Sequence, residues 1–459
     1  MRKLTSAVFR KYTGTLLFIP SWIMVAVVIP ELQQGPSISD LTISAAVGCI
    51  FIAVLRSVEN APFMLFSTKK LILLTSVIGL CFTGLFLIAS SRYSDFYVQL
   101  SRFGSDAMTT GKDVILFGDF RHLTDAASCT LPTNVGLVNC DLWLRPFNQN
   151  PDLPLLLNYF HLYNSLILGF AIFMYFMVTV CVYVNRFLVA GPAIILTLIS
   201  PVVVLAIDRG NEILTIALIL SALIFLESKS KKLRVIAPFF ILFAVIFKVW
   251  PILFLPILIF RRDLVSRLSA LFVLIVSLIY WAVKLNQLNA MLAATGTPPI
   301  FNLSFGLKPF FDTDFFNPTS IFLFMTLLAL TILFIKFDVG NAEKIFDHDL
   351  RQHNDVLIFS SLIFTYTLVW LIGNSYIYRI IVVLPLVLLL SQRKYLLNAS
   401  SANTRAVVLG ILFVSKLPIT FAFSGALSLT FMYFLLKNRK MLMPNRLNLH
   451  FSNVRAREV

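Results

Sequence analysis

Residues Leu71–Tyr97 read LILLTSVIGLCFTGLFLIASSRYSDFY, and this stretch decides the fold class of the chain. Its first part, Leu71–Ala89, is apolar and carries no charged residue. A helix of about 17–25 apolar residues matches the hydrocarbon thickness of a membrane. The residues that follow are polar, so the stretch predicts a spanning helix that ends at a membrane surface.

The rest of the chain repeats this pattern of apolar runs. Of its 459 residues, 58% are hydrophobic and 13% are charged, whereas soluble domains average roughly 45–50% and about 25%. A spanning backbone must satisfy its own hydrogen bonds, which favours helices, and the strict alternation of a membrane β-barrel is absent. The sequence predicts an all-α polytopic membrane protein, with residues 1–459 forming one integral membrane domain of about 13–14 spanning segments.

The longest polar segment, Ser91–Leu155, follows the third predicted helix. It carries seven acidic residues against five Lys or Arg. Cytoplasmic loops carry an excess of Lys and Arg, so this segment is expected on the extracytoplasmic side. Its acidic residues are Asp95, Asp106, Asp113, Asp119, Asp125, Asp141 and Asp152.

The basic residues lie in short loops between apolar runs, as orientation signals do. The net charge of +16 therefore indicates membrane topology, and nucleic acid is not expected as a partner. The apolar run from Gly14 to Pro30 lacks a small-residue cleavage site, which favours a retained first helix over a signal peptide. The sequence predicts a multi-pass protein of the cell membrane with both termini in the cytoplasm.

The apolar run Val235–Phe260 lies between two basic segments that both favour the cytoplasm. Its middle reads Phe247-Lys248-Val249-Trp250-Pro251, and Pro both breaks a helix and restricts the residue before it. We expect two short antiparallel half-spans with Lys248 at their turn; the alternative is one kinked helix with a snorkelling lysine. A similar short pair is expected over residues 406–436, broken near Pro418.

Three cations are predicted at outer helix ends: Arg209, Lys248 and Arg379. Ionisable groups at membrane depth are costly and usually pair or serve a function. Arg209 follows Asp208 directly, so the two could form a closed interfacial turn. Alternatively, the planar guanidinium fork suits a phosphate, and three cations facing one acidic loop are typical of a site for an anionic, lipid-linked substrate.

Asp95 and Asp106 are the candidate catalytic residues of the acidic loop. A carboxylate just beyond a helix end can act as general base towards an acceptor hydroxyl, while cations stabilise the departing phosphate. The alternative for Asp95 is a helix N-cap, a common use of Asp.

The same loop contains Cys129 and Cys140, which are expected to form a disulfide because oxidising compartments lie on the outer side. The alternative is two unpaired thiols. No Cys or His cluster has metal-ligand spacing, so no cofactor or tightly bound metal is predicted, although a divalent cation in the outer loop remains compatible with the sequence.

Four motifs together resemble the glycosyltransferase 87 family, which uses polyprenyl-phosphate sugars and belongs to the GT-C superfamily. The resemblance covers residues 95–263. Its motifs are Ser94-Asp95-Phe96-Tyr97 with Gly111, then Cys140-Asp141-Leu142-Trp143-Leu144-Arg145-Pro146-Phe147-Asn148, then Asp208-Arg209-Gly210-Asn211, and finally Phe247-Lys248-Val249-Trp250-Pro251-Ile252-Leu253-Phe254-Leu255-Pro256 closed by Arg261-Arg262-Asp263.

The resemblance implies a GT-C-like helical bundle and an inverting transferase that works on the outer face. The acidic residue of the family's first outer loop corresponds most naturally to Asp95. Two helices precede the third one here where the family usually has one before its acidic loop, so Asp106 is the second candidate. The usual double proline is missing near Asn150-Pro151, which leaves the acceptor side undefined.

The sequence therefore favours the transfer of a sugar (a hexose or a pentose) from a polyprenyl-phosphate donor to a glycan or lipid acceptor. Membrane lipids, this donor and this acceptor are the expected partners. The alternatives are a polymerase or ligase of lipid-linked polysaccharide, and a transporter or flippase. Transporters often contain paired broken helices in corresponding halves, and the two broken pairs near Pro251 and Pro418 are not obviously related in sequence.

Overall fold

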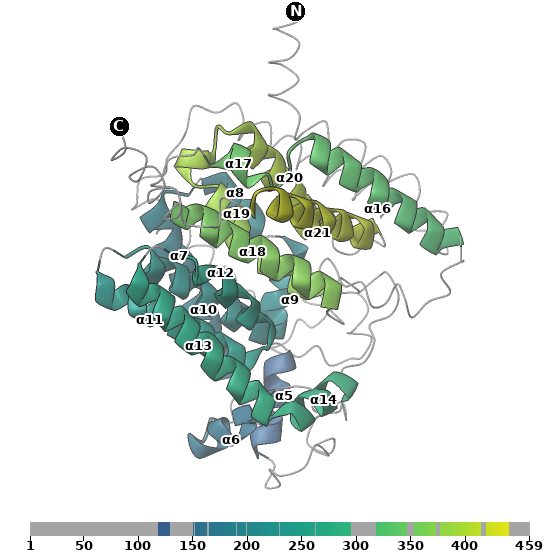
Figure 1. Ribbon diagram of the computed structural model, residues 1–459. Helices are drawn as coiled ribbons and strands as arrows, with labels where there is room; N and C mark the ends of the chain where they lie inside the picture. Colours follow the sequence, from purple (N-terminus) through teal and green to yellow (C-terminus); the bar gives the residue numbers. More distant parts are fainter. Residues whose placement is uncertain are drawn as a thin grey trace, which may run out of the picture.

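The protein is a bundle of α-helices (Figure 1). The structure, a computed structural model, describes residues 118–128, 150, 152–162, 165–189, 191–198, 200–228, 230–261, 263–294, 318–346, 353–372, 377–414 and 419–439. Within these ranges the chain forms no β-strand, and Val189 and Gln392 make an isolated antiparallel bridge. The predicted all-helical fold is confirmed for this part of the chain.

The first half of the described chain contains two short helices followed by longer ones. These elements are α5 (Gly118–Ser128), α6 (Asp152–Tyr159), α7 (Ser165–Phe187), α8 (Gly191–Leu198), α9 (Pro201–Arg209), α10 (Asn211–Leu226), α11 (Lys231–Phe247), the 3₁₀ helix η2 (Trp250–Phe254), α12 (Leu255–Leu258), α13 (Leu264–Val283) and α14 (Leu285–Ala294). In Figure 1, α5, α6 and α14 lie together at the lower end of the molecule.

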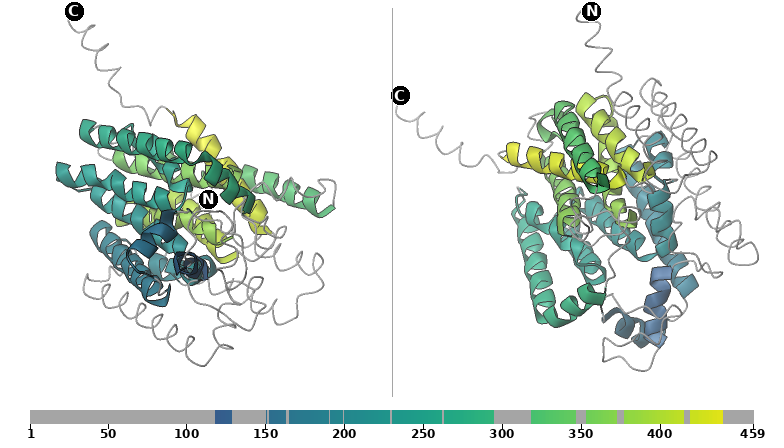
Figure 2. Two further views of the ribbon diagram at one scale, coloured as in Figure 1. Left: turned by 90° about the horizontal axis from the view of Figure 1, so that it is seen from below. Right: turned by 90° about the vertical axis from the view of Figure 1, so that its right-hand side faces the viewer.

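The second half packs against the first. Its elements are α16 (Pro318–Lys336), α17 (Ala342–Ile345), α18 (His353–Ile372), η4 (Ile377–Val383), α19 (Leu384–Leu390), η5 (Arg393–Tyr395), α20 (Ala399–Val414) and α21 (Ile419–Lys437). Helices α16 and α21 run side by side, and α18 packs against α21 (Figures 1 and 2).

Two breaks divide helices that the apolar runs predict as continuous. The predicted helix from Leu156 to Val184 is split, because α6 ends at Tyr159 and α7 begins only at Ser165. The predicted helix before Ile207 is also split, at Ser200 and Pro201. Pro201 occupies the first turn of α9, where its missing N–H is tolerated. Hydropathy does not place such breaks, because a few polar residues within a long apolar run, such as Asn158, His161 and Asn164, do not by themselves show that a helix ends.

The predicted reversal at Lys248 is confirmed. Helix α11 ends at Phe247, and Lys248 caps it in an extended conformation. Lys248 lies beside Glu212 at the start of α10, whereas Arg261, thirteen residues on, lies beside Glu227 at the end of α10. The chain therefore turns back along α10, and the alternative of one kinked helix is wrong. The 17-residue α11 is nevertheless longer than the predicted half-span.

Helix α13 buries mostly small side chains and exposes large apolar ones, the reverse of a helix in a soluble protein. Its buried face consists of Ser266, Ala270, Val273, Ser277 and Trp281. Its exposed residues include Leu264, Leu268, Phe272, Leu278 and Ile279. A soluble helix buries its large apolar residues, whereas membrane helices place small residues against their neighbours. The exposed face of α13 is therefore suited to lipid.

Two helices in the described part of the chain are long and apolar enough to cross a membrane. One is α13, most of which is exposed, and the other is the Asn354–Leu371 part of α18, which is mostly buried. Because the core helix of a soluble protein can also be long and apolar, α13 is the more informative of the two.

A close approach of three helices forms the core of the second half. At Gly425 of α21, an added Cβ would lie 2.6 Å from Leu327 Cδ1 of α16 and 2.7 Å from Trp370 Cζ2 of α18. Gly340, just before α17, adopts a φ of +80°, and a Cβ added to it would lie 2.4 Å from the Phe431 ring. Glycine at both positions allows backbone and ring to approach this closely.

Candidate functional site

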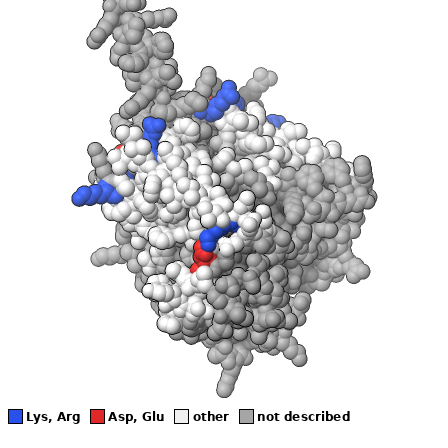
Figure 3. Space-filling view, turned by 60° about the horizontal axis from the view of Figure 1, so that its bottom comes forward, with Lys and Arg blue, Asp and Glu red and all other residues white. Residues whose placement is uncertain are grey.

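The described ion pairs gather at the two ends of the bundle, and on the face shown in Figure 3 most of the described surface is uncharged. We call one end the α6 end; it contains Asp152, Arg209, Glu212, Lys248 and Lys284. The other, the α17 end, contains the ion pairs Arg261–Glu227, Arg234–Asp263, Lys344–Asp338 and Lys394–Asp355.

Arg209 and Glu212 lie on either side of a tight junction at the α6 end. Arg209 ends α9, and Gly210, with a φ of +84°, alone connects it to α10. Few non-glycine residues adopt this backbone conformation. The junction keeps both side chains within one turn of each other, and both are buried.

Glu212 places the predicted phosphate-binding lysine. The Lys248 ammonium lies 3.7 Å from Glu212 Oε1, whose side chain is fully buried. Lys248 itself keeps 16% of its side chain exposed. The pair fixes the end of α11 against the start of α10 and leaves the ammonium within reach of solvent.

The third predicted cation belongs to an element that packs here too. Arg379 lies in η4, which contacts α9 and α10. The described side chains do not include that of Arg379, so the structure shows only that its element packs against the helices that carry Arg209 and Glu212. Asp95, Asp106, Cys129 and Cys140 lie outside the described residues, so both acids and the disulfide remain predictions.

A polar network that the sequence did not indicate holds α6 in place. Asn150 donates from Nδ2 to the Ile246 carbonyl and to Tyr280 Oη, at 2.7 Å each. Tyr280 donates to Asp152 Oδ2 at 2.7 Å, and Lys284 pairs with Oδ1 of the same carboxylate. Burial alone raises the pKa of Asp152, but the hydrogen bonds from Lys284 and Tyr280 outweigh it and lower the pKa. Asp152 is therefore an anchor between α6 and α13.

An apolar cavity of about 220 Å³ lies directly beneath α6. The residues that line it are all Leu, Ile or Phe. The walls include Phe120 of α5, Leu157 of α6, Leu168 and Ile172 of α7, Leu214 of α10 and Phe247 of α11. The lining residues Phe247 and Leu214 belong to the same helix ends as Lys248 and Glu212, so the cavity lies at the end of the bundle that holds this ion pair.

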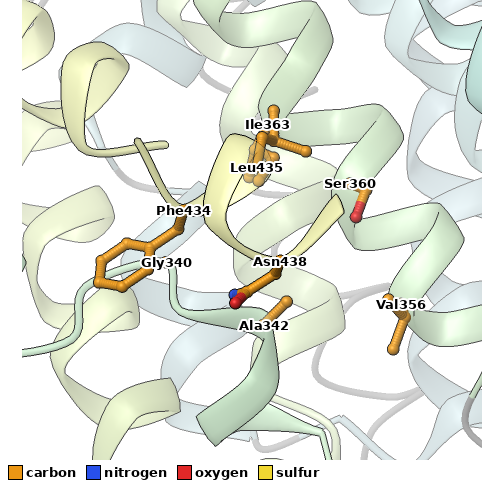
Figure 4. A pocket seen from close by; sticks show the side chains of 8 residues that line it. All are labelled: Gly340, Ala342, Val356, Ser360, Ile363, Phe434, Leu435 and Asn438. Atoms are coloured by element: carbon orange, nitrogen blue, oxygen red, sulfur yellow. The ribbon is translucent and has the colours of Figure 1, made fainter. Parts of the chain in front are cut away.

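A second hollow, at the α17 end, is too small to bind a substrate. Figure 4 shows it between α17, α18 and α21, with Ser360 and Asn438 among its lining residues. Its volume is about 10 Å³, and a cavity needs roughly 10–15 Å³ to hold a single water molecule.

The described residues contain no group of three His, Cys, Asp or Glu that could hold a metal ion. What the α6 end offers instead is three cationic groups (Arg209, Lys248 and Lys284), two carboxylates (Asp152 and Glu212) and an apolar cavity. This combination suits a ligand that is anionic at one end and hydrocarbon at the other.

No protein-family model, curated protein or solved structure matches the chain. What this site can do therefore rests on its own residues.

Two features of the site were missed from the sequence. Glu212 is an acid within the apolar run that forms α10, and ionisable residues in such runs are a usable signal. The pairing of Asp152 with Tyr280 and Lys284 joins residues about 130 positions apart. No local pattern in the sequence indicates such a contact.

Proposed function

We propose that this protein is a membrane glycosyltransferase of the GT-C type, resembling glycosyltransferase 87. It transfers a sugar from a polyprenyl-phosphate donor to a glycan or lipid acceptor on the extracytoplasmic face. The observation that carries the proposal is the α6 end, where Arg209 and Lys248 flank the start of α10. Cations held beside an apolar cavity match a lipid phosphate, which is both anionic and hydrocarbon.

The proposed reaction assigns separate roles to the cations and the acids. The acceptor hydroxyl attacks the anomeric carbon of the sugar, and the bond from that carbon to the phosphate oxygen breaks with inversion. Asp95, or else Asp106, takes the proton of the attacking hydroxyl. Arg209, Lys248 and Arg379 stabilise the charge that develops on the leaving lipid phosphate.

Glu212 supports this assignment through its effect on Lys248. The Glu212 carboxylate lies 3.7 Å from the Lys248 ammonium and so fixes the position of the lysine at the end of α11. Because Lys248 remains partly exposed, the ammonium can still approach a ligand.

The membrane setting is part of the proposal. The exposed apolar face of α13 supports contact with lipid, and a reaction on a lipid-linked donor requires the site to lie at a membrane surface. The ion pairs at each end of the bundle are compatible with the two membrane surfaces, with the α6 end outside.

The deciding experiment is sugar transfer by the purified full-length protein in lipid, supplied with a panel of polyprenyl-phosphate sugars. Asp95→Asn and Asp106→Asn are compared with wild type, and loss of the general base should lower turnover by about 100- to 10,000-fold. Wild-type turnover in both variants would contradict the assignment of the base. No transfer from any donor of the panel would contradict the function itself.

The phosphate-binding cations are tested separately through donor affinity. Arg209→Ala, Lys248→Ala and Arg379→Ala should each weaken donor binding by roughly 10- to 100-fold, the value of a charged hydrogen bond. Lys344→Ala is the matched control, because Lys344 is an exposed cation at the α17 end. Unchanged affinity in all three variants would exclude these residues from the donor site.

A further inference from the structure

The cavity beneath α6 has a lining that excludes most ligands. Its lining side chains are all Leu, Ile or Phe, so a sugar, a free phosphate or an ordered water would find no side-chain hydrogen bond inside it to replace those it makes with water. Enclosed apolar cavities of roughly 150 Å³ stay dry and bind small hydrocarbons. The cavity of about 220 Å³ is therefore suited to a segment of hydrocarbon chain.

The cavity also opens to the surface along α6. Leu156 and Leu162 line it, and yet 52% of Leu156 and 42% of Leu162 are exposed. The neighbouring Tyr159 and Phe160 are exposed as well, with their rings 5.2 Å apart. Aromatic side chains of this kind concentrate at membrane–water interfaces. A chain already in the membrane can thus reach the cavity over an apolar and aromatic surface.

Two cations, Lys248 and Arg209, lie close in sequence to residues that line the inner wall of the cavity. Phe247 lines the cavity, and the adjacent residue is Lys248, whose Cα lies about 3.8 Å further along the backbone. Leu214 lines it too, one turn along α10 from the Gly210 junction and from buried Arg209. A chain in the cavity would place a terminal anion near these cations.

Hydrogen bonds at the first turn of α6 hold this helix, and with it the opening of the cavity, in a fixed position. Asp152 accepts from Tyr280 and Lys284 of the α13 segment, and Asn150 donates to the end of α11. Tyr159, at the far end of α6, is exposed.

We propose that the cavity between α5, α6, α7, α10 and α11 binds the hydrocarbon chain of a lipid phosphate, with the phosphate towards Lys248. The identity of this lipid as the sugar donor rests on the proposed function, whereas the binding of the chain does not. A hydrocarbon chain without a phosphate and a second protein chain are the other possible occupants, and the experiment separates them.

The probe is a C20 polyprenyl phosphate without sugar that carries a photoreactive diazirine in its chain. It is cross-linked to the full-length protein in lipid nanodiscs, and the modified residues are found by mass spectrometry. We expect modification of the cavity wall, at Leu157 and Leu168, and competition by unlabelled polyprenyl phosphate. Competition by a polyprenol lacking the phosphate should be weaker by roughly tenfold or more, the contribution of one charged hydrogen bond.

Two substitutions fill the cavity from opposite walls: Leu157→Trp on α6 and Leu168→Trp on α7. Each should reduce cross-linking by roughly tenfold, the loss expected when about two methylene groups no longer fit. Leu155→Trp is the matched control, because Leu155 is an exposed residue of the same helix and does not line the cavity. Thermal unfolding of each variant verifies that it is folded.

The outcomes distinguish this inference from the proposed function. Cross-linking confined to the exposed face of α13, or unchanged cross-linking in both folded tryptophan variants, would overturn the cavity as a chain site even if sugar transfer were observed. Equal competition by the phosphate-free polyprenol would overturn the orientation towards Lys248. Cavity cross-linking without any sugar transfer would support the inference and contradict the glycosyltransferase.

Discussion

Glu212 and Lys248 are the residues whose interaction most affects the α6 end. The Glu212 carboxylate is fully buried, and the Lys248 ammonium is 3.7 Å from it. Removing one member of a buried pair leaves a charge without its counter-charge and costs about 3–5 kcal/mol, whereas removing both costs much less. The pair can therefore be tested by a double-mutant cycle.

We predict that Lys248→Met lowers the free energy of unfolding by about 3 kcal/mol. Glu212→Gln should lower it by a similar amount, and the double variant should lose less than the sum of the two. Lys248→Arg, which keeps the charge, serves as the control and should stay within about 1 kcal/mol of wild type. The measurement is chemical unfolding of the purified protein; additive losses in the double variant would mean that the two residues do not interact.

At the residue scale, sequence patterns predicted the cations better than their partners. Lys248 was found because Pro251 breaks an apolar run beside it, and the structure places it at the predicted turn. Its partner Glu212 was missed, because the contact joins two helices across 36 positions of the chain. The Asp152–Tyr280–Lys284 network was missed for the same reason. Hydropathy and local motifs contain no information on which helix ends meet.

At the scale of elements, helix α21 depends on a glycine for its packing. At Gly425 an added Cβ would meet the Leu327 side chain and the rigid ring of Trp370, both closer than 3.0 Å. Leu327 can rotate its terminal methyl away, whereas the buried indole of Trp370 has little room to move. The three helices α16, α18 and α21 are therefore held at a separation that only glycine permits.

We predict a graded loss of stability as the side chain at position 425 grows. Gly425→Ala should lower the free energy of unfolding by about 1 kcal/mol, because overpacking exceeds the gain in helix propensity, and Gly425→Leu by about 3 kcal/mol. Leu436→Ala on the exposed end of the same helix should change it by less than about 0.5 kcal/mol. Chemical unfolding is the measurement, and equal stability of Gly425→Leu and wild type would refute the close packing.

Helix types and approximate ranges could be predicted because apolar runs have the length of helices. The apolar runs predict one helix over about Leu268–Val283 and another that ends at Lys336; α13 covers Leu264–Val283 and α16 ends at Lys336. Hydropathy did not place the breaks before α7 and α9, because a few polar residues within a long apolar run do not show where a helix ends. The sequence also did not predict that α13 buries its small residues and exposes its large ones. That arrangement depends on which neighbouring helix covers each face of α13.

For the whole molecule, the unequal charge of its two ends sets an orientation. The described residues at the α17 end include more cations than acids: Arg186, Arg234, Arg261, Lys336, Lys344, Arg393, Lys394, Arg405 and Lys437 against Glu227, Asp263, Asp338, Glu343 and Asp355. At the α6 end the cations Arg209, Lys248 and Lys284 stand against the acids Asp152 and Glu212. Cytoplasmic surfaces carry the excess of Lys and Arg, so the α17 end should face the cytoplasm.

This orientation can be tested with single cysteines at the two ends. In a variant with the natural cysteines replaced by serine, Asn286→Cys introduces a thiol on α14 at the α6 end, and Ser230→Cys introduces one before α11 at the α17 end. Both positions are exposed. A membrane-impermeant maleimide added to intact cells should label position 286 at once and position 230 only after permeabilisation, since the bilayer separates the two ends.

The labelling pattern decides between three arrangements of the whole molecule. The predicted pattern supports an outer α6 end, which the proposed reaction on an extracytoplasmic donor requires. The reverse pattern would place Arg209, Lys248 and the apolar cavity inside the cell and would invert the proposed topology. Equal labelling of both positions in intact cells would contradict a membrane between the two ends, and the exposed face of α13 would then have to be covered by protein instead of lipid.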